Sequence, residues 1–302
     1  MSSVPARVSF KNAGRKKSLA RAENTRSPQR QTSQILLPSG QITLRPLLLI
    51  AALISFRAFA EDSQVVALVK QGDNEDRKGH SRAALTCFRA AETLDPQNVG
   101  VLLRIAKEYS DLIADTKPED AARAIADKSL DYSKRAVELD PHSAKGRLSL
   151  AVAYGRLTDF VGNKVKLEYS RLIKEETDKS IELDPSDDFA WHVLGRWNFG
   201  VANVNAVLKA MARFIYGGLP AASNEDAAKC LKKATEIAPQ RIIHHSELAR
   251  VYQTMGRKEL AAKEWQTVLA LPAVDKEDEK DKHEAQTALG TTNTGPGKSA
   301  SR

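Results

Sequence analysis

A recurring Leu-Asp-Pro triplet constrains the fold of this chain more than any other feature. The triplet ends at Pro96, Pro141 and Pro185, a weaker Ile-Ala-Pro copy ends at Pro239, and a Leu-Pro pair ends at Pro272. Proline lacks the amide hydrogen that a helix interior needs, so each copy should end one helix and redirect the chain. The spacings of 45, 44, 54 and 33 residues match the 34-residue tetratricopeptide period, either closely or with roughly ten or twenty residues added. We therefore expect lengthened, irregular helical hairpins.

The residues around each triplet support this interpretation. A small residue stands five positions before each of the first four prolines: Ala91, Ala136, Ser180 and Ala234. A good N-cap residue stands two positions after the first three prolines: Asn98, Ser143 and Asp187. The fourth copy has Arg241 there, which offers no cap. The pattern predicts a close crossing of two helices before each proline and a capped helix start after it.

The fourth repeat fits the tetratricopeptide pattern best. Its small and large apolar positions are Leu248, Ala249, Tyr252, Ala261 and Trp265, with Gly256 at the turn between the two helices. The third repeat opens with Trp191, Leu194 and Gly195 in the same spacing. We predict an all-α, tetratricopeptide-like helical-hairpin solenoid with twelve helices between residues 64 and 289. The last, over 275–289, is a mixed-charge stretch expected to cap the solenoid with a solvated face.

Positive charge is confined to the start of the chain. The net charge is +8, yet residues 1–60 hold ten Lys/Arg and one acid, while residues 61–302 hold 36 basic and 37 acidic residues. A basic chain usually suggests a nucleic-acid partner. Because the repeat region is close to neutral, we expect no nucleic-acid partner.

The leader has the parts of a targeting sequence. Residues 1–45 are basic and lack apolar periodicity, so we expect disorder there. An apolar run over 46–56 is too short to span a bilayer, and Ala58-Phe59-Ala60 resembles a cleavage site. Residues 46–60 thus predict a secretory signal and an exported or periplasmic location. A mitochondrial transit peptide, and a retained segment touching a membrane only through 46–56, remain alternatives. The repeat domain is expected over 61–289 and a flexible tail over 290–302.

Motifs for catalysis are missing from the sequence. There is no nucleophile elbow, phosphate-binding loop or dinucleotide fingerprint, and we expect no cofactor and no metal. Cys87 and Cys230 lack ligand spacing and are expected as small buried core residues. The adjacent His244 and His245 point in different directions on a helix and are interpreted as packing or surface residues. An enzyme with its site in the insert over 204–224 is the weakest hypothesis.

A peptide-binding groove is the predicted site. In tetratricopeptide arrays the first helix of each repeat lines the concave surface, and a row of cations there could hold acidic side chains or a C-terminal carboxylate. Ordinary solvated charges are the competing interpretation. The residues expected to face the groove are Lys107, Lys145, His192, Arg196, Phe199, Arg250 and Gln253. Three of them, Lys107, Arg196 and Arg250, occupy the same position in their repeats.

The order of the insertions resembles one family of repeat proteins. The segments that carry the resemblance are 103–111, 162–166, 173–185, 192–202 and 216–228. They are similar, over roughly residues 64–289, to the regulator of microtubule dynamics family. The resemblance implies a helical tetratricopeptide domain without catalytic chemistry. It also implies association with microtubules if the source is eukaryotic, and a membrane-tethered or mitochondrial location for some members.

Two functions therefore remain open at the level of sequence. The first is a non-catalytic scaffold that binds a protein or peptide, acidic ones included, in its concave groove. The alternative is a microtubule-associated regulator of microtubule dynamics, whose basic leader, if retained, would suit acidic tubulin tails. A bacterial, exported homologue of the family is also compatible with the leader.

Overall fold

The computed structural model describes residues 62–290, and within this range every regular element is helical. The first described helix covers residues 62–76. It is followed by α2 (Ser81–Leu94), α3 (Val99–Leu112), α4 (Glu119–Leu139), α5 (Ala144–Leu157), the short 3-10 helix η1 (Thr158–Phe160), α6 (Asn163–Leu183), α7 (Asp188–Ala202), α8 (Ala206–Tyr216), α9 (Asn224–Ile237), α10 (Ile242–Thr254), α11 (Lys258–Ala270) and α12 (Lys276–Ala288). The twelve α-helices expected from the sequence are thus confirmed, with bounds that agree within two residues.

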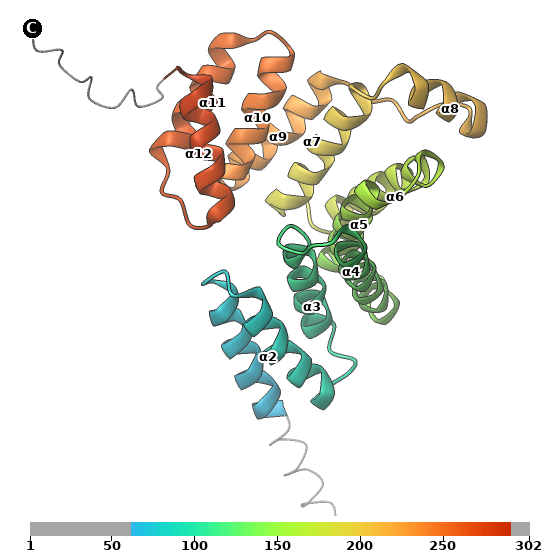
Figure 1. Cartoon of the computed structure of the whole chain (residues 1–302), viewed down its shortest axis with the longest axis vertical. Helices are drawn as coiled ribbons and strands as arrows, with labels where there is room; N and C mark the ends of the chain where they lie inside the picture. The colour runs from blue at the N-terminus through green and yellow to red at the C-terminus, as the bar shows by residue number, and fades with distance from the viewer. Residues whose placement is uncertain (1–61, 291–302) are drawn as a thin grey trace, which may run out of the picture. The chain divides into compact units, whose positions relative to one another are not determined.

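The helices form antiparallel hairpins that stack in chain order (Figure 1). We call the opening helices of the hairpins (62–76, α3, α5, α7 and α10) the first helices, and their partners (α2, α4, α6, α9 and α11) the second helices. The second helices α2, α4, α6 and α9 each pack on the first helix of the next hairpin, and α12 packs on α11 and α10 where another first helix would stand. The fold is the expected helical-hairpin solenoid.

The insertions fall where they leave this stacking intact. Two second helices, α4 and α6, are 21 residues long, whereas α2, α9 and α11 have 13 or 14 residues. The longest insertion is α8, which lies between α7 and α9 and contacts α6. Leader residues 1–45, the segment 46–60 and nearly all of the tail 290–302 lie outside the described residues, so the expected domain limits stay predictions.

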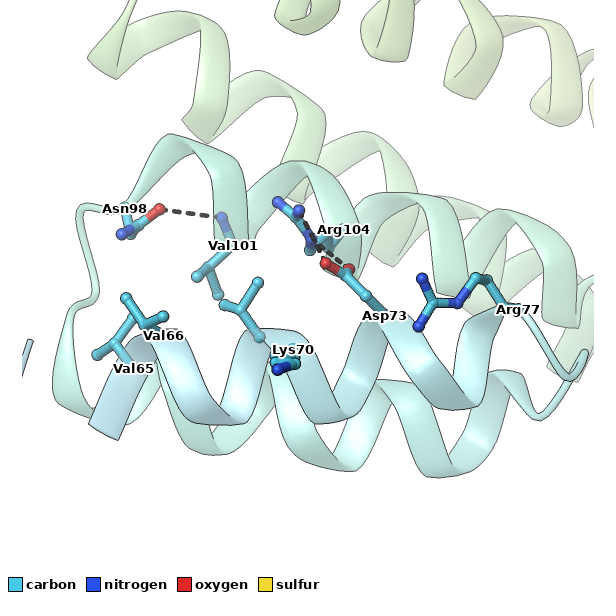
Figure 2. Close-up of a pocket in the computed structure, with 9 residues that line it drawn as sticks. Val65, Val66, Lys70, Asp73, Arg77, Asn98, Val101 and Arg104 are labelled. Atoms are coloured by element: carbon cyan, nitrogen blue, oxygen red, sulfur yellow. Dashed lines mark hydrogen bonds and ion pairs between the residues drawn. The ribbon is translucent and has the colours of Figure 1, made fainter. Parts of the chain in front are cut away.

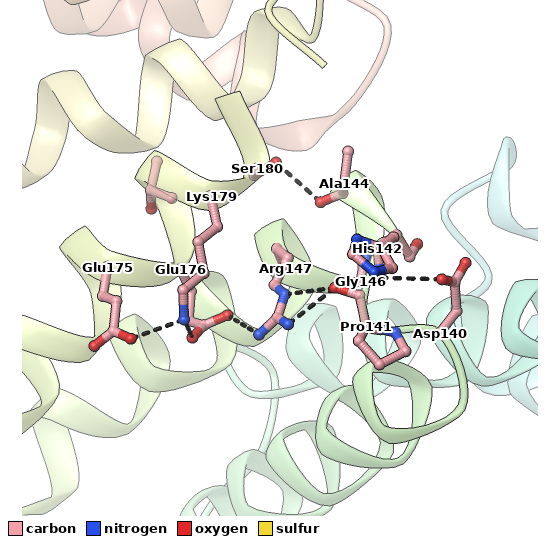
Figure 3. A network of polar contacts seen from close by, with 12 residues as sticks. Asp140, Pro141, His142, Ala144, Gly146, Arg147, Glu175, Glu176, Lys179 and Ser180 are labelled. Carbon is pink, nitrogen blue, oxygen red and sulfur yellow. Dashed lines mark hydrogen bonds and ion pairs between the residues drawn. The ribbon is translucent and has the colours of Figure 1, made fainter. Parts of the chain in front are cut away.

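The small residue before each proline marks a close helix crossing, as predicted. Ala91, Ala136, Ser180 and Ala234 are all 0% exposed. The serine uses its hydroxyl at the crossing, because Oγ donates a 2.9 Å hydrogen bond to the backbone carbonyl of Ala144 on the neighbouring helix (Figure 3). A larger side chain at any of these four positions would separate the two backbones.

The predicted caps are also confirmed. Asn98 accepts a hydrogen bond from the amide of Val101, Ser143 accepts from Gly146, and Asp187 accepts from the two amides of Phe189 and Ala190. Arg241 provides no side-chain cap, as expected. Such caps contribute about 1 kcal/mol each, so three of the helix starts are fixed by residues that the sequence already identifies.

One arginine ties a proline turn to the following hairpin. Nε and Nη2 of Arg147 donate to the carbonyl of Pro141 at 3.1 and 2.9 Å, while its Nη1 lies 2.9 Å from a carboxylate oxygen of Glu176 on α6 (Figure 3). Lys179 completes the group, with its Nζ 3.0 Å from the same carboxylate. The turn between α4 and α5 is therefore fixed by polar contacts as well as by proline.

The core consists of the faces that successive helices turn toward one another. The residues of the fourth repeat named from the sequence are all buried: Leu248, Ala249, Tyr252, Ala261 and Trp265. Cys87 and Cys230 are buried and free, as expected. Trp197 is more deeply buried than Trp191, whose indole N–H reaches only the carbonyl of Pro185.

The final helix differs from expectation in one respect. Its mixed-charge sequence predicted a solvated face, but Asp278 and Asp281 of α12 are each 8% exposed. Asp278 accepts from the amide of Val274, and Asp281 accepts from the Ser246 hydroxyl and from Arg250. These carboxylates therefore attach the cap to the rest of the solenoid, through α10 and the preceding loop, rather than facing water.

A matched pair of glycines in α7 tests the close packing. A Cβ at Gly195 would lie 2.6 Å from Cγ of Leu231 and 3.3 Å from the carbonyl oxygen of Ala227, whereas a Cβ at Gly200 would meet nothing within 4 Å. We expect Gly195→Ala to lower the free energy of unfolding by about 1–3 kcal/mol through overpacking. Gly200→Ala should raise it by about 0.5–1 kcal/mol, because alanine is the better helix former. Urea unfolding followed by circular dichroism would measure both, and equal effects would contradict the packing described.

Candidate functional site

Polar contacts join consecutive first helices into a ladder. Arg104 on α3 donates to Asp73 on the preceding first helix at 2.6 Å, 31 residues back in the chain. At the other end, Arg250 on α10 pairs with Asp281 and Glu284 on α12. The groups are partly exposed, so each pair contributes up to about 1 kcal/mol. These contacts mainly fix the orientation of one first helix against the next.

The three cations predicted to form a row in the groove are engaged in this ladder. Lys107 Nζ lies 2.6 Å from Asp76, and Arg196 Nε lies 3.4 Å from Glu247 on α10. Arg250 has the most partners of the three, because it pairs with three carboxylates. Its guanidinium also lies over the ring of Trp265, 5.7 Å from the ring centroid. Arg196 keeps the most exposed side chain of the three, at 60%.

Lys107 lies within a cluster of acids. Asp76, Glu108 and Asp111 present carboxylate oxygens within 4.8 Å of one another. Lys107 Nζ stands 2.6, 3.5 and 2.8 Å from them, so the ammonium already neutralises the cluster. Burial works against the charge of Lys107, yet Asp111 and the other acids hold its pKa above the ordinary value. Burial, with the neighbouring acids, raises the pKa of Glu108 to about 7.

The remaining predicted residues take different positions. Phe199 packs against the core between α7, α9 and α10, where it is partly buried. Lys145 and Gln253 lie on α5 and α10, and both are exposed. His192 is 1% exposed and lies between α7 and α10. The seven residues are thus spread over four first helices, and His192 and Arg196 are brought together in one hollow.

That hollow, of about 480 Å³, lies between α5, α6 and α7 and is bordered by the insert that contains α8. In the described part of the chain, neither an ion pair nor a side-chain hydrogen bond joins α5 to α7, whereas every other consecutive pair of first helices is joined by at least one. The ladder is therefore interrupted where the hollow opens. Its lining is Ala151, Val152, Gly155, Arg156, Thr158, Asp159, Lys166, Leu167, Ser170, Ile173, Phe189, His192, Val193, Arg196, Trp197, Gly200, Val201, Val204, Leu208 and Leu219.

A second hollow, of about 420 Å³, lies between the helix over 62–76 and α3 (Figure 2). Val65, Val66 and Val101 form its apolar side, and Lys70 and Arg77 line it as well. Its most central polar groups are already paired, because Nε and Nη2 of Arg104 meet the two carboxylate oxygens of Asp73 at 2.6 and 3.1 Å. This hollow lacks a buried polar group that needs a ligand.

Two buried histidines form a relay beside the larger hollow. His244 Nε2 lies 2.7 Å from a carboxylate oxygen of Asp188, and His244 Nδ1 lies 3.0 Å from His192 Nδ1. Arg241 also contacts Asp188, at 2.6 Å. Phe189 stacks on the ring of His192, with centroids 5.1 Å apart. Asp188, which stands in the first turn of α7, thus orients both imidazoles.

The relay fixes where the protons lie. Burial lowers the pKa of His244, and it lowers the pKa of His192 well below the ordinary range, which favours the neutral form of both rings. Because a carboxylate only accepts, His244 donates from Nε2 to Asp188 and its Nδ1 is left as an acceptor. His192 must then donate from Nδ1, which leaves Nε2 as a bare acceptor.

His192 Nε2 is one of three buried side-chain atoms without a hydrogen-bond partner among the described residues. The others are Glu108 Oε2 and Trp265 Nε1. Of the three residues, only His192 lines either of the two hollows. A buried polar atom without a partner costs about 1–3 kcal/mol, and a donor that reached Nε2 would remove that cost.

Sequence reasoning missed this relay. It placed His192 in the groove and interpreted His244 and His245 as packing or surface residues. His244 is a packing residue, with one ring nitrogen on Asp188. The missed partner lies 56 residues earlier in the chain. The one available signal is Asp188, an acid in the first turn of α7, which the repeat pattern does not single out.

Comparison with known proteins agrees with this architecture. The model of the family described as "Regulator of microtubule dynamics protein 1-3" matches residues 63–293. Regulator of microtubule dynamics protein 1 of Mus musculus is 28% identical over 194 residues, which cover 63% of this chain and 63% of that protein. Protein 2 of Homo sapiens is 28% identical over 187 residues, covering 62% of this chain and 46% of that protein. The chain therefore spans less than two thirds of these relatives.

The fold also has a match among solved structures. A thermophilic tetratricopeptide-repeat protein of Thermus thermophilus superposes with a TM-score of 0.56 and 18% sequence identity. The match covers 74% of this chain and 98% of that one. At this identity the likeness shows the fold alone. Within residues 62–290, moreover, none of the helices combines the length and the apolar character needed to cross a bilayer.

The tautomer of His192 can be measured directly. We expect its Nδ1 to carry the proton and its Nε2 to be unprotonated at neutral pH, because Asp188 and His244 impose that arrangement. Long-range ¹⁵N–¹H correlation spectra of ¹⁵N-histidine-labelled protein report both nitrogens, and the spectrum of His192→Phe assigns the signals. A proton on His192 Nε2 at pH 7.5 would contradict the relay.

Proposed function

Because the chain belongs to the regulator of microtubule dynamics family, we propose that it is a non-catalytic tetratricopeptide scaffold that binds a protein or peptide along its first helices. The hairpin architecture supports this, since stacked helical repeats present an extended surface of first helices to partners. The family and the fold both point away from catalysis. The chemistry of binding must then come from individual residues on that surface.

One observation carries the proposal: the hollow between α5 and α7. It brings together Arg196 and His192, two residues that the repeat pattern had already assigned to a binding groove. Its volume of about 480 Å³ is within the usual range for ligand sites. It also lies at the one junction of first helices that no side-chain hydrogen bond or ion pair closes within residues 62–290.

The charge of the surface favours an acidic partner at this place. Arg156, Lys166 and Arg196 line the hollow together with a single acid, Asp159. Elsewhere on the first helices the predicted cations Lys107 and Arg250 are already paired with carboxylates of this chain. We therefore place the expected attraction for acidic side chains at the hollow rather than along the whole row.

A second candidate function is direct regulation of microtubules. The names of the family and of its relatives support it. The basic leader, with ten Lys/Arg and one acid in residues 1–60, would suit acidic tubulin tails. For location we accordingly propose a cytoplasmic, microtubule-associated or mitochondrial protein. Export through a signal at 46–60 remains an expectation from the sequence.

The binding surface is tested by reversing one charge at the hollow. We expect Arg196→Glu to weaken the binding of partners captured by the full-length chain about tenfold or more, measured by quantitative mass spectrometry after crosslinking. Arg196 is 60% exposed, so the variant should fold. Lys232→Glu on α9, 65% exposed and away from the hollow, is the matched control. Equal loss in both variants, or loss in neither, would contradict the assignment of this surface.

The microtubule function is tested by sedimentation. If the leader supplies the affinity, the full-length chain should co-sediment with purified microtubules at low salt and be released as salt rises, because exposed charges are screened. Intact-mass measurement of the cellular protein establishes whether residues 1–60 are present. Absence of co-sedimentation by a full-length chain would exclude direct binding and leave the scaffold proposal standing.

A further inference from the structure

We propose that the hollow between α5 and α7 selects an acidic peptide segment by one aromatic side chain, tyrosine or tryptophan, that donates a hydrogen bond to Nε2 of His192. The proposal rests on the scaffold function above and specifies its ligand. Three features of the hollow lead to it: a bare acceptor, apolar walls and a cationic rim.

The acceptor sets the first requirement. One edge of the His192 ring is used by its Nδ1 bond to His244, and Phe189 covers a face of the ring. His244 does not line the hollow, whereas His192 does. Nε2 is therefore the one polar atom of the ring left for a ligand, and because it is buried, neighbouring side chains of the lining must shift for a ligand's donor to reach it. Since Nε2 has no proton to give, the ligand must provide an O–H or N–H group.

The walls set the second requirement. Val152 of α5, Ile173 of α6 and Val201 of α7 line the hollow, and Leu208 and Leu219 close it from the insert. An apolar body is needed to fill such a space without leaving further polar groups unpaired. Tyrosine and tryptophan combine a large apolar ring with one hydrogen-bond donor at the edge. Phenylalanine would fill the same space but leave Nε2 without a partner.

The rim sets the third requirement. Nε of Arg156 donates to the hydroxyl of Ser110, and Nε of Arg196 lies against a carboxylate oxygen of Glu247. The Nη groups of both arginines take no part in these two contacts. Lys166 adds a third cation, and Asp159 is the only acid in the lining. Glutamate and aspartate next to the aromatic residue would meet these cations, and the attraction should weaken with salt.

A peptide library supplies the test even though the partner is unidentified. The probe is a set of displayed dodecapeptides with a fixed central Tyr, Trp or Phe and flanks randomised over all amino acids. Selection on the full-length protein should enrich Tyr and Trp over Phe at the centre by about tenfold or more, with Glu and Asp in the flanks. The tenfold figure corresponds to about 1.4 kcal/mol, which is within the cost of a buried unpaired acceptor.

Two variants show whether the selected peptides use the hollow. Gly200→Leu places a side chain into open space in the lining, so α7 should fold while the hollow is blocked and binding is lost. Gly200→Ala is the matched control and should still bind. His192→Phe removes the acceptor, after which a Tyr peptide and its Phe counterpart should bind equally. Fluorescence anisotropy measures the affinities, and circular dichroism checks that each variant is folded.

Each outcome bears on a different statement. Preference for Tyr and Trp that disappears in His192→Phe supports the inference, and the ¹⁵N signal of His192 Nε2 should then shift when the peptide binds. Peptides that bind equally with Phe but are lost in Gly200→Leu would overturn the inference and leave the proposed function intact. Enriched peptides that are insensitive to Gly200→Leu, or no enrichment at all, would overturn the inference at this site. In that last case the crosslinking experiment with Arg196→Glu separately decides the scaffold function.

Discussion

The close crossing of helices at small residues is the constraint on which the rest of the structure depends. Ala91, Ala136, Ser180 and Ala234 are fully buried five residues before a proline, and Gly195 approaches Leu231 so closely that a methyl group has no space. Two helices that meet at such a point can pack in only one relative position along their axes. The proline turn then sets the direction of the helix that follows. Insertions are then tolerated only away from the crossings, which explains why α4 and α6 can be long and why α8, between α7 and α9 in the chain, leaves the packing of these two helices intact.

Register at the crossings determines which charges meet on the first helices. Asp73 and Arg104, like Asp76 and Lys107, are 31 residues apart, close to one repeat length, and each pair spans two consecutive first helices. A row of cations in equivalent positions therefore does not make a continuous cationic groove, because acids of the neighbouring helix neutralise it. The ladder is interrupted between α5 and α7, and that interruption coincides with the hollow at which we propose binding.

Local signals explain what could be predicted from the sequence. Proline turns, the caps at Asn98, Ser143 and Asp187, and the period of apolar residues act within a few positions, so the helices and the fold class followed from them. The candidate site could be predicted only in part. His192 and Arg196 were placed in the groove by repeat position, but the pairing of Arg250 with α12 and the contact of His244 with Asp188 depend on how two helices are rotated against each other. The position of a residue within its repeat does not specify how the two helices are rotated.

The contrast between two buried histidines bears on the binding that we propose at the hollow. His245 has both ring nitrogens engaged, on Glu264 and on the carbonyl of Pro239; burial lowers its pKa, but these hydrogen bonds outweigh that effect and raise the pKa. His192, in contrast, has its Nε2 unpartnered and its pKa held low by burial. An apolar ring at 192 would leave Nδ1 of the buried His244 without a donor, whereas histidine satisfies that acceptor and leaves its own Nε2 unpaired, at a cost of about 1–3 kcal/mol. In the proposed complex a donor on Nε2 would offset that cost, so the histidine would favour the bound state over the free one.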